Sequence, residues 1–341
     1  MPIPTKESDE RAIAAAAAAA DDAAGAAAGE ESKGAAGGAL PCSSTPSCRP
    51  AQCAGASAAP AGGGKREDQA LKDDIINNFP RLTRDARFKF DCHKSISCFN
   101  TCCRDVNIVL TPYDALRLRK RLGLSSHELL LHHTIQPFNK DQKLPVVLLK
   151  MTEDANKSCP FVSEEGCTVY EDRPWACRMY PVGLASSKTS SNQYGEEFYF
   201  VLDEDHCRGG DENREWSIAQ WLDDQKVADY DRMGDLFKEV TLHPRLLRGE
   251  ALEPQKMEMY FMACYDLDRM RRFVFGSSFL DRFEVEGDVV ERLRTDEEAL
   301  LAFSFRWLQF CLFGDPTMKP KAEVLEACKQ SKSASTENHK E

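Results

Sequence analysis

Eight cysteines lie between positions 92 and 207, and their thiolates are side chains that suit soft metal ions. They are Cys92, Cys98, Cys102, Cys103, Cys159, Cys167, Cys177 and Cys207. The first four fall within the polar, loop-like segment DCHKSISCFNTCCRD. Thiolates at this density are typical of zinc sites and iron–sulfur clusters. The sequence therefore predicts a cysteine-ligated metal centre in this part of the chain.

The adjacent pair Cys102–Cys103 favours metal binding over a disulfide. Neighbouring Cα atoms are about 3.8 Å apart, whereas disulfides usually span about 4.4–6.8 Å. A disulfide between neighbours is therefore strained. Two thiolates that point to different metal atoms, or to different sites, require less distortion of the chain.

The alternative interpretation is that these cysteines are ordinary buried apolar residues. Their sequence context argues against it, because Cys159 precedes a proline and Cys167 follows a glycine. Arginines also follow three of the cysteines directly, at Arg104, Arg178 and Arg208. Cationic neighbours stabilise thiolates and anionic clusters. We therefore expect all eight cysteines to be metal ligands.

The other six cysteines and two nearby histidines are expected to have different roles. Accidental or reactive thiols are predicted at Cys42, Cys48, Cys53 and Cys328, which lie in low-complexity sequence. Packing roles are predicted for Cys264 and Cys311, which lie in apolar helical stripes. For His93 and His206, beside Cys92 and Cys207, we expect supporting or exposed positions rather than metal ligation.

Helices and short strands must position these cysteines. Thr111, Pro112 and Asp114 form a helix start, and Gly123 is a natural end for that helix. Ser125 and Glu128 predict a second helix directly afterwards, through about residue 133. A further helix is expected at Asp68–Asn78, and strands at Ile108–Leu110, Leu144–Met151 and Glu196–Leu202.

Beyond residue 214 the apolar spacing becomes helical. Two stripes recur every three or four residues, and each is expected to face a core. The stripes are Met257, Tyr260, Cys264, Leu267, Met270 and Val274, and then Leu300, Phe303, Trp307, Phe310 and Cys311. The predicted fold class is α+β, a small cysteine-rich metal-binding region of short strands and loops followed by a mainly helical C-terminal region.

Composition divides the 341 residues into four parts. Residues 1–66 are rich in Ala, Gly, Ser and Pro, and we expect a disordered arm because they bury little apolar surface. Residues 67–210 form the predicted cysteine-cluster domain, and residues 211–315 the helical region. Residues 316–341 are expected to be a disordered tail.

The net charge of −11 disfavours nucleic acid as a partner, since binding it requires neutralisation of phosphates. The basic run Arg117, Arg119, Lys120 and Arg121 is interpreted as a solvated helix face. The chain start does not resemble a signal peptide, and no run of roughly 18 apolar residues suggests a membrane span. We therefore expect a cytoplasmic protein, in a compartment that disfavours structural disulfides.

From Phe90 onward the chain resembles the YkgJ-type cysteine-cluster family, also called the CxxCxxCC domain. The matching segments are Cys92–Arg104, Ile108–Asp114, Cys159–Val162, Gly166–Tyr170, Arg173–Pro181 and His206–Gly209. One departure is visible, because five residues separate the first two cysteines whereas the family name implies two. The geometry of the ligands is therefore open.

The resemblance implies an iron–sulfur or zinc protein, and also an enzyme class, because flagellin lysine N-methylases carry this domain. A Rossmann-type methyl-donor site would need a strand and a Gly-rich turn that opens a helix, and residues 67–315 contain no such unit. Ser-His-Asp and phosphate-loop signatures are absent as well. Whether the protein is an enzyme is left open.

Three hypotheses follow. The leading one is an iron–sulfur protein, with a 4Fe–4S cluster, that transfers electrons or senses redox state. The second is a protein lysine N-methylase of the flagellin type. The third is a structural zinc module that presents the helical region to a protein partner. Eight cysteines suffice for two four-thiolate sites, or for one such site plus a second of another kind, and the sequence does not pair them.

Overall fold

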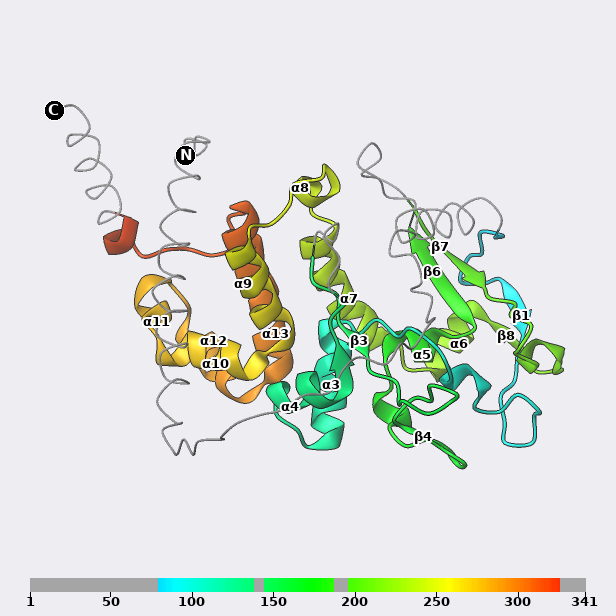
Figure 1. The fold of residues 1–341 in the computed structure, drawn as a ribbon. Helices are drawn as coiled ribbons and strands as arrows, with labels where there is room; N and C mark the ends of the chain where they lie inside the picture. The colour runs from blue at the N-terminus through cyan, green and yellow to red at the C-terminus, as the bar shows by residue number, and fades with distance from the viewer. Residues whose placement is uncertain (1–78, 138–143, 187–195, 326–341) are drawn as a thin grey trace, which may run out of the picture.

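A computed structural model describes residues 79–137, 144–186 and 196–325 of the chain (Figure 1). The predicted arm at residues 1–66 and the predicted helix Asp68–Asn78 lie outside these residues, as do the four cysteines expected to be accidental or reactive. What the structure describes is an α+β fold, which confirms the predicted fold class.

The strands are short and form four antiparallel pairs in the described residues. The pairs are β1 (Arg87–Lys89) with β8 (Glu215–Ser217), β2 (Thr134–Ile135) with β3 (Leu148–Leu149), β4 (Val162–Ser163) with β5 (Gly166–Cys167), and β6 (Val182–Ser186) with β7 (Glu197–Val201). The strand predicted at 196–202 is confirmed as β7. The one predicted at 144–151 is reduced to the two residues of β3, and that at 108–110 to a single bridge between Val109 and Leu148.

Helices make up most of the remaining structure. The α-helices are α3 (Pro112–Leu122), α4 (Ser126–His133), α5 (Trp175–Met179), α6 (Ile218–Asp224), α7 (Ala228–Thr241), α8 (Pro244–Leu247), α9 (Pro254–Tyr265), α10 (Leu267–Gly276), α11 (Phe279–Arg282), α12 (Gly287–Thr295) and α13 (Glu297–Leu308). Short helical turns are η2 (Thr101–Cys103), η3 (Tyr170–Asp172), η4 (Gly209–Asp211) and the π-helical η5 (Gln309–Phe313).

Both predicted capping boxes are present. Asp114 and Thr111 exchange hydrogen bonds at the start of α3, and Glu128 and Ser125 do so at the start of α4. Gly123 ends α3 in the left-handed conformation, with φ of 67°. Such a conformation is strained for residues with a Cβ, which explains why the helix ends at this position.

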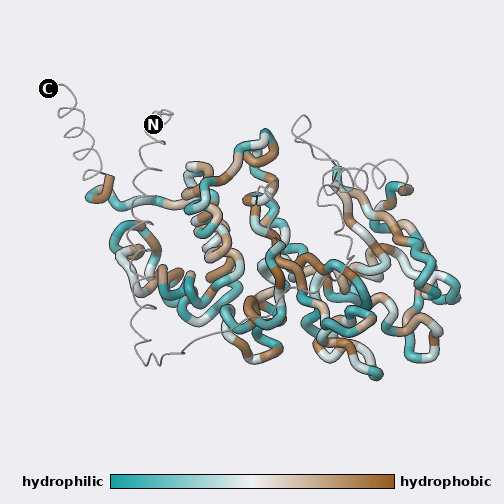
Figure 2. Tube along the Cα trace, viewed as in Figure 1, coloured by the Kyte–Doolittle hydropathy of each residue, from teal (hydrophilic) through white to brown (hydrophobic). Residues whose placement is uncertain are grey.

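The larger of two cores joins α3, α4 and β3 to the helices from α7 to η5 (Figure 1). Both predicted apolar stripes contribute to it, although Asp266 divides the first stripe between α9 and α10 by capping the start of α10. Hydrophobic and hydrophilic segments alternate along these helices in Figure 2, as in amphipathic helices generally. Cys264 and Cys311 are buried in this core, which confirms their packing roles.

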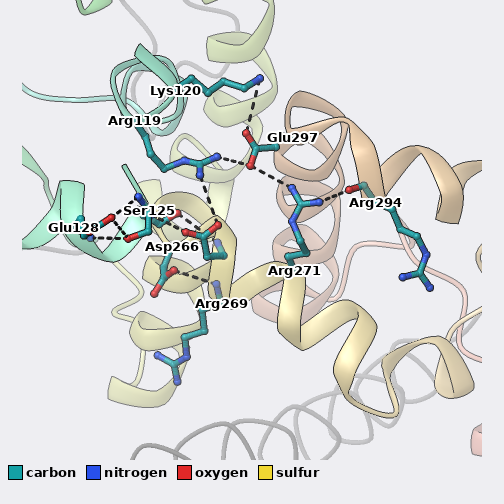
Figure 3. Close-up of polar contacts among 11 residues, drawn as sticks. Arg119, Lys120, Ser125, Glu128, Asp266, Arg269, Arg271, Arg294 and Glu297 are labelled. Atoms are coloured by element: carbon teal, nitrogen blue, oxygen red, sulfur yellow. Dashed lines mark hydrogen bonds and ion pairs between the residues drawn. The ribbon is translucent and has the colours of Figure 1, made fainter. Parts of the chain in front are cut away.

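A polar network also holds α3 to the C-terminal helices (Figure 3). Glu297, at the start of α13, accepts hydrogen bonds from Arg119 of α3 and Arg271 of α10. Arg119 also faces Asp268, whose carboxylate accepts a hydrogen bond of 2.7 Å from the backbone N–H of Ser126. Helix α3 is therefore held against α10 and α13 through Arg119.

The second core is smaller and surrounds the strands on the other side of the molecule (Figure 1). Its buried residues are Phe90, Met179, Val182, Trp216, Ile218, Trp221, Leu222 and Val227. Trp221 stacks edge-on against the rings of both Phe90 and Trp216. This aromatic cluster supports the segments that enter and leave the cysteine-rich region.

Each core takes residues from both sides of position 210, so the cores do not follow the predicted division into two domains there. The division itself stays a prediction. Met318 is buried, and Lys319 accepts a backbone hydrogen bond from Glu284. Folded structure thus extends past residue 316, where the tail was predicted to begin.

None of the described helices is long and apolar enough to cross a bilayer.

Candidate metal centre

All eight predicted ligand cysteines lie in the described residues, and each is a free thiol. Cys92 and Cys98 lie in the loop after β1, Cys102 and Cys103 in η2, Cys159 before β4, Cys167 in β5, Cys177 in α5, and Cys207 before η4. Cys92 and Cys102 are exposed and the other six are partly buried. None lies in the fully buried core, which is what the sequence context predicted.

An outer group of thiols consists of Cys92, Cys98 and Cys207. The backbone N–H of Arg208 donates a hydrogen bond of 3.1 Å to Sγ of Cys98, which joins two loops that are far apart in sequence. Burial, together with negative charge on the neighbouring Cys102, Cys98 and Cys207, raises the pKa of Cys92 to about 11. Cys98 and Cys207 are therefore both close to Cys92.

An inner group consists of Cys159, Cys167 and Cys177. The β4–β5 hairpin brings Cys167 back beside Cys159, and Val162 pairs with Cys167. Burial raises the pKa of Cys177 to about 12, with Cys159 and Cys167 as contributing neighbours. Burial also raises the pKa of Cys159, and there Cys167 is the thiol that contributes most.

The adjacent pair Cys102–Cys103 neighbours both groups through Cys102. A hydrogen bond between the two side chains lowers the pKa of Cys102 to about 7 and raises that of Cys103. The backbone N–H of Cys159 donates to the carbonyl of Cys103 at 2.8 Å, which fixes the pair against the inner group. Negative charge on Cys102 raises the pKa of Cys92 and also that of Cys159. Because each group has three thiols, one thiol from the pair would complete a set of four in each.

The thiols are neighbours but do not form a closed coordination sphere. Within the part of the chain that the structure describes, no three Cys, His, Asp or Glu side chains are placed so that they could hold one ion. Metal ligation requires thiolates, and the raised pKa values of most of these thiols mean that metal binding would have to displace their protons. The donor chemistry fits zinc or an iron–sulfur cluster, which are both ligated by four thiolates.

Two polar side chains near the cysteines, Arg173 and Tyr180, each have one buried polar atom without a hydrogen-bond partner, although Arg173 also donates to Gln225 through its terminal nitrogen. Nε of Arg173 and the hydroxyl of Tyr180 have no hydrogen-bond partner among the described residues. The charge of Arg173 favours ionisation of Cys102, Cys167 and Cys177. Tyr180 faces Cys207, and burial raises its pKa. Buried polar atoms without partners are uncommon, and these two lie next to the thiols.

A buried carboxylate, Asp114, holds the start of the short helix α5, which carries Cys177. Oδ1 of Asp114 accepts a hydrogen bond of 2.7 Å from the backbone N–H of Trp175, at the start of α5. Its Oδ2 accepts two bonds of 2.8 Å from Thr111. Asp114 is fully buried, and burial raises its pKa to about 6 although nearby Arg178 opposes this shift. One carboxylate thus caps both α3 and α5.

Two of the three arginines that follow a cysteine in the sequence direct their side chains to other groups. The guanidinium of Arg178 donates to the carbonyls of Arg173, Gln225 and Glu171 instead. Arg208 acts through its backbone, and its side chain lies 3.8 Å from Asp211. Arg173 is a cation whose charge acts on the cysteines, and its only signal in the sequence was its place at the start of the matching segment Arg173–Pro181.

The two histidines lie at the surface of the site. Nε2 of His93 is 3.8 Å from Glu212, and Nε2 of His206 is 3.3 Å from Glu204. Both side chains are more than a third exposed. These positions agree with the exposed role that we expected for them.

Gly209 is a further residue on which the site depends. Its carbonyl accepts a hydrogen bond of 3.1 Å from the N–H of Asp91, beside Cys92. A Cβ at this position would lie 2.3 Å from the ring of Phe90, whereas a Cβ on Gly210 would meet nothing within 4 Å. Only a residue without a side chain lets the Cys207 loop approach Phe90 this closely.

We therefore expect Gly209→Ala to lower thermal stability and the metal content of the purified protein, since the overpacked ring costs about 1–3 kcal/mol. Gly210→Ala is the matched control, and we expect it to retain wild-type metal content. Metal analysis and thermal melts of the two variants, prepared in parallel, provide the measurement. Equal metal loading in both variants would contradict this role for Gly209.

Residues 91–208, about a third of the chain, match the model of the CxxCxxCC family, whose description is "Putative zinc- or iron-chelating domain". The match begins beside Cys92 and ends after Cys207, so it contains all eight cysteines of the candidate centre. Neither a curated protein nor a solved structure matches the chain. The family match confirms the resemblance seen in the sequence and supports a metal-binding, cysteine-rich domain.

Proposed function

Starting from a CxxCxxCC domain at residues 91–208, we propose that the protein is an iron–sulfur protein that transfers electrons or senses redox state. The observation that carries the proposal is the arrangement of the thiols. The outer and inner groups each have three thiols, and we propose that the adjacent pair Cys102–Cys103 supplies a fourth to each when metal binds. Four thiolates are the usual ligand set of a 4Fe–4S cluster.

The surroundings of the thiols favour a redox cluster over structural zinc. Nε of the buried Arg173 has no hydrogen-bond partner although its guanidinium also donates to Gln225, and the Tyr180 hydroxyl lies beside Cys207. Cations and hydrogen bonds at cluster sulfurs set the reduction potential of an iron–sulfur centre. A structural zinc ion has no redox state for such groups to adjust. These buried side chains thus have a specific role in the iron–sulfur hypothesis.

Each part of the chain has a distinct task in this proposal. The eight cysteines hold the metal, which supplies one-electron chemistry when it is bound. Asp114 fixes α5 and with it Cys177, while Arg173 places positive charge beside the sulfurs. The partner would be a protein that donates or accepts electrons, and we propose the cytosol as the compartment because free thiols are kept there in reduced form.

Methyl transfer is not part of the proposal. A Rossmann-type donor site is built on parallel strands joined by helices. The strands of the described residues pair only as two-stranded antiparallel sheets. The Gly-rich turn that such a site needs was also absent from residues 67–315 of the sequence.

The test is anaerobic purification followed by a visible absorption spectrum and analysis of iron, zinc and acid-labile sulfide. We expect a brown protein that contains iron and sulfide in matching amounts and bleaches on reduction. A colourless protein with stoichiometric zinc and no redox response would overturn the proposal. That result would make a structural zinc module, with a protein-binding role, the better description.

A further inference from the structure

An open cleft lies beside the cysteine-rich region and is lined by charged side chains. Its volume is about 390 Å³, and it is lined by Arg117, Lys120, Arg121, Asp172 and Glu298. The three cations come from the C-terminal half of α3, and the two carboxylates from η3 and α13. Small-molecule sites are usually about 300–1,000 Å³, so the volume suits a small ligand.

Both carboxylates of the cleft are already satisfied by protein groups. Asp172 accepts two hydrogen bonds from Arg117, at 2.9 and 2.6 Å. Glu298 accepts one from the Tyr113 hydroxyl at 2.8 Å and one from Arg232 at 3.0 Å. Neither carboxylate therefore needs a cationic ligand, and Arg117 is occupied as well.

The other two cations have unused hydrogen-bonding capacity. Nζ of Lys120 lies 3.8 Å from Glu297, beyond hydrogen-bond distance, and the side chain is half exposed (Figure 3). Glu297 is itself engaged by Arg119 and Arg271. Arg121 is exposed and donates one hydrogen bond of 3.4 Å to the carbonyl of Thr168. Lysine has three donors and arginine five, so most of their donors are available to a ligand.

We infer that this cleft binds a small molecule through a phosphate monoester group, held by Lys120 and Arg121. A phosphate monoester carries about −1.5 to −2 charges at pH 7, which matches two cations, whereas a single carboxylate needs only one. Arginine recognises phosphate through its planar fork and lysine through its point charge. The two carboxylates in the walls and the net charge of −11 disfavour extended polyanions such as nucleic acid.

The position of the cleft places this ligand next to the metal domain. Asp172, which holds Arg117, is the last residue of η3, and the following residue Arg173 faces the thiols. The cleft and the candidate metal centre thus share one short turn. The phosphate site does not depend on which metal the cysteines hold, so its test is independent of the proposed function.

The test uses the full-length protein, purified with its metal, and inorganic phosphate as the probe. Isothermal titration at constant ionic strength should show saturable millimolar binding of phosphate and much weaker binding of acetate. Lys120→Gln combined with Arg121→Gln should weaken phosphate binding by about tenfold or more, because charge-assisted hydrogen bonds are lost. Circular dichroism and metal content would show that this variant is folded.

The matched control is Arg292→Gln with Arg294→Gln, which removes the same charge from the last turn of α12. It should bind phosphate as the wild type does. Three results would each overturn the inference: no saturable phosphate binding, equal weakening in both double variants, or acetate binding as tightly as phosphate. The last of these would indicate a carboxylate site instead.

Discussion

Removing one cysteine from the outer group and one from the inner group is expected to abolish most metal binding, whereas removing two from the same group is not. Cys207→Ala should leave about half of the metal, because a second four-thiolate site remains intact. Adding Cys92→Ala should change little further, since both residues belong to the emptied site. Adding Cys177→Ala instead should empty both sites. Metal and sulfide analysis of the anaerobically purified variants provides the measurement.

The design avoids the adjacent pair, because Cys102 contributes to the pKa of thiols in both groups and Cys103 is coupled to Cys102. Cys264→Ala is the control, since Cys264 is buried in the larger core. It should lower thermal stability by opening a small cavity while metal content stays at the wild-type value. If the same-group and cross-group double variants retained equal amounts of metal, the eight thiols would form a single site and the two groups would be disproved.

Asp114→Ala is expected to reduce the free energy of unfolding by about 3–5 kcal/mol, a large effect for one side chain. The substitution removes a fully buried carboxylate and leaves the N–H groups of Thr111 and Trp175 without their acceptor. It also removes a negative charge that interacts with the buried guanidinium of Arg178. Because α5 loses its anchor, we expect metal content to fall as well. Chemical denaturation followed by circular dichroism measures the change in stability.

Asp229→Ala provides the comparison for Asp114. Asp229 lies in the first turn of α7 and its side chain is mostly exposed, with Arg232 at 3.5 Å. Surface ion pairs contribute about 0–1 kcal/mol, so this variant should be nearly as stable as the wild type. Similar losses in the two variants would show that Asp114 is an ordinary helix-capping residue and not a link between α3 and α5.

Local signals in the sequence predicted the elements that depend on local chemistry. The capping residues Thr111 and Ser125 and the terminator Gly123 fix the ends of α3 and α4, because they satisfy backbone groups within a few residues. The strand signal at Leu144–Met151 was less reliable. A run of apolar residues also arises in a segment that packs on a core without a continuous partner strand, and here only β3 is paired.

The composition of the candidate metal centre was also visible in the sequence. Thiols in polar and turn-rich surroundings were distinguished from Cys264 and Cys311, whose helical spacing placed them in the core. The residue types alone determined the chemistry, since several thiolates close together suit zinc and iron–sulfur clusters. The family match at residues 91–208 supports the same conclusion about metal binding.

Only the tertiary structure decided which residues surround that chemistry. Cys98 accepts a hydrogen bond from the backbone N–H of Arg208, and Asp114 accepts one from that of Trp175. These residues are far apart in the sequence, and no periodicity or spacing predicts that they come together. Burial depends on the whole packed fold, so the sequence could not show that Arg173 faces the thiols while Arg178 is held by carbonyl groups. The sequence by itself determined the ligand chemistry and the helix ends, because both are local properties. The grouping of the thiols and the charges beside them depend on contacts between distant segments, and those exist only in the folded chain.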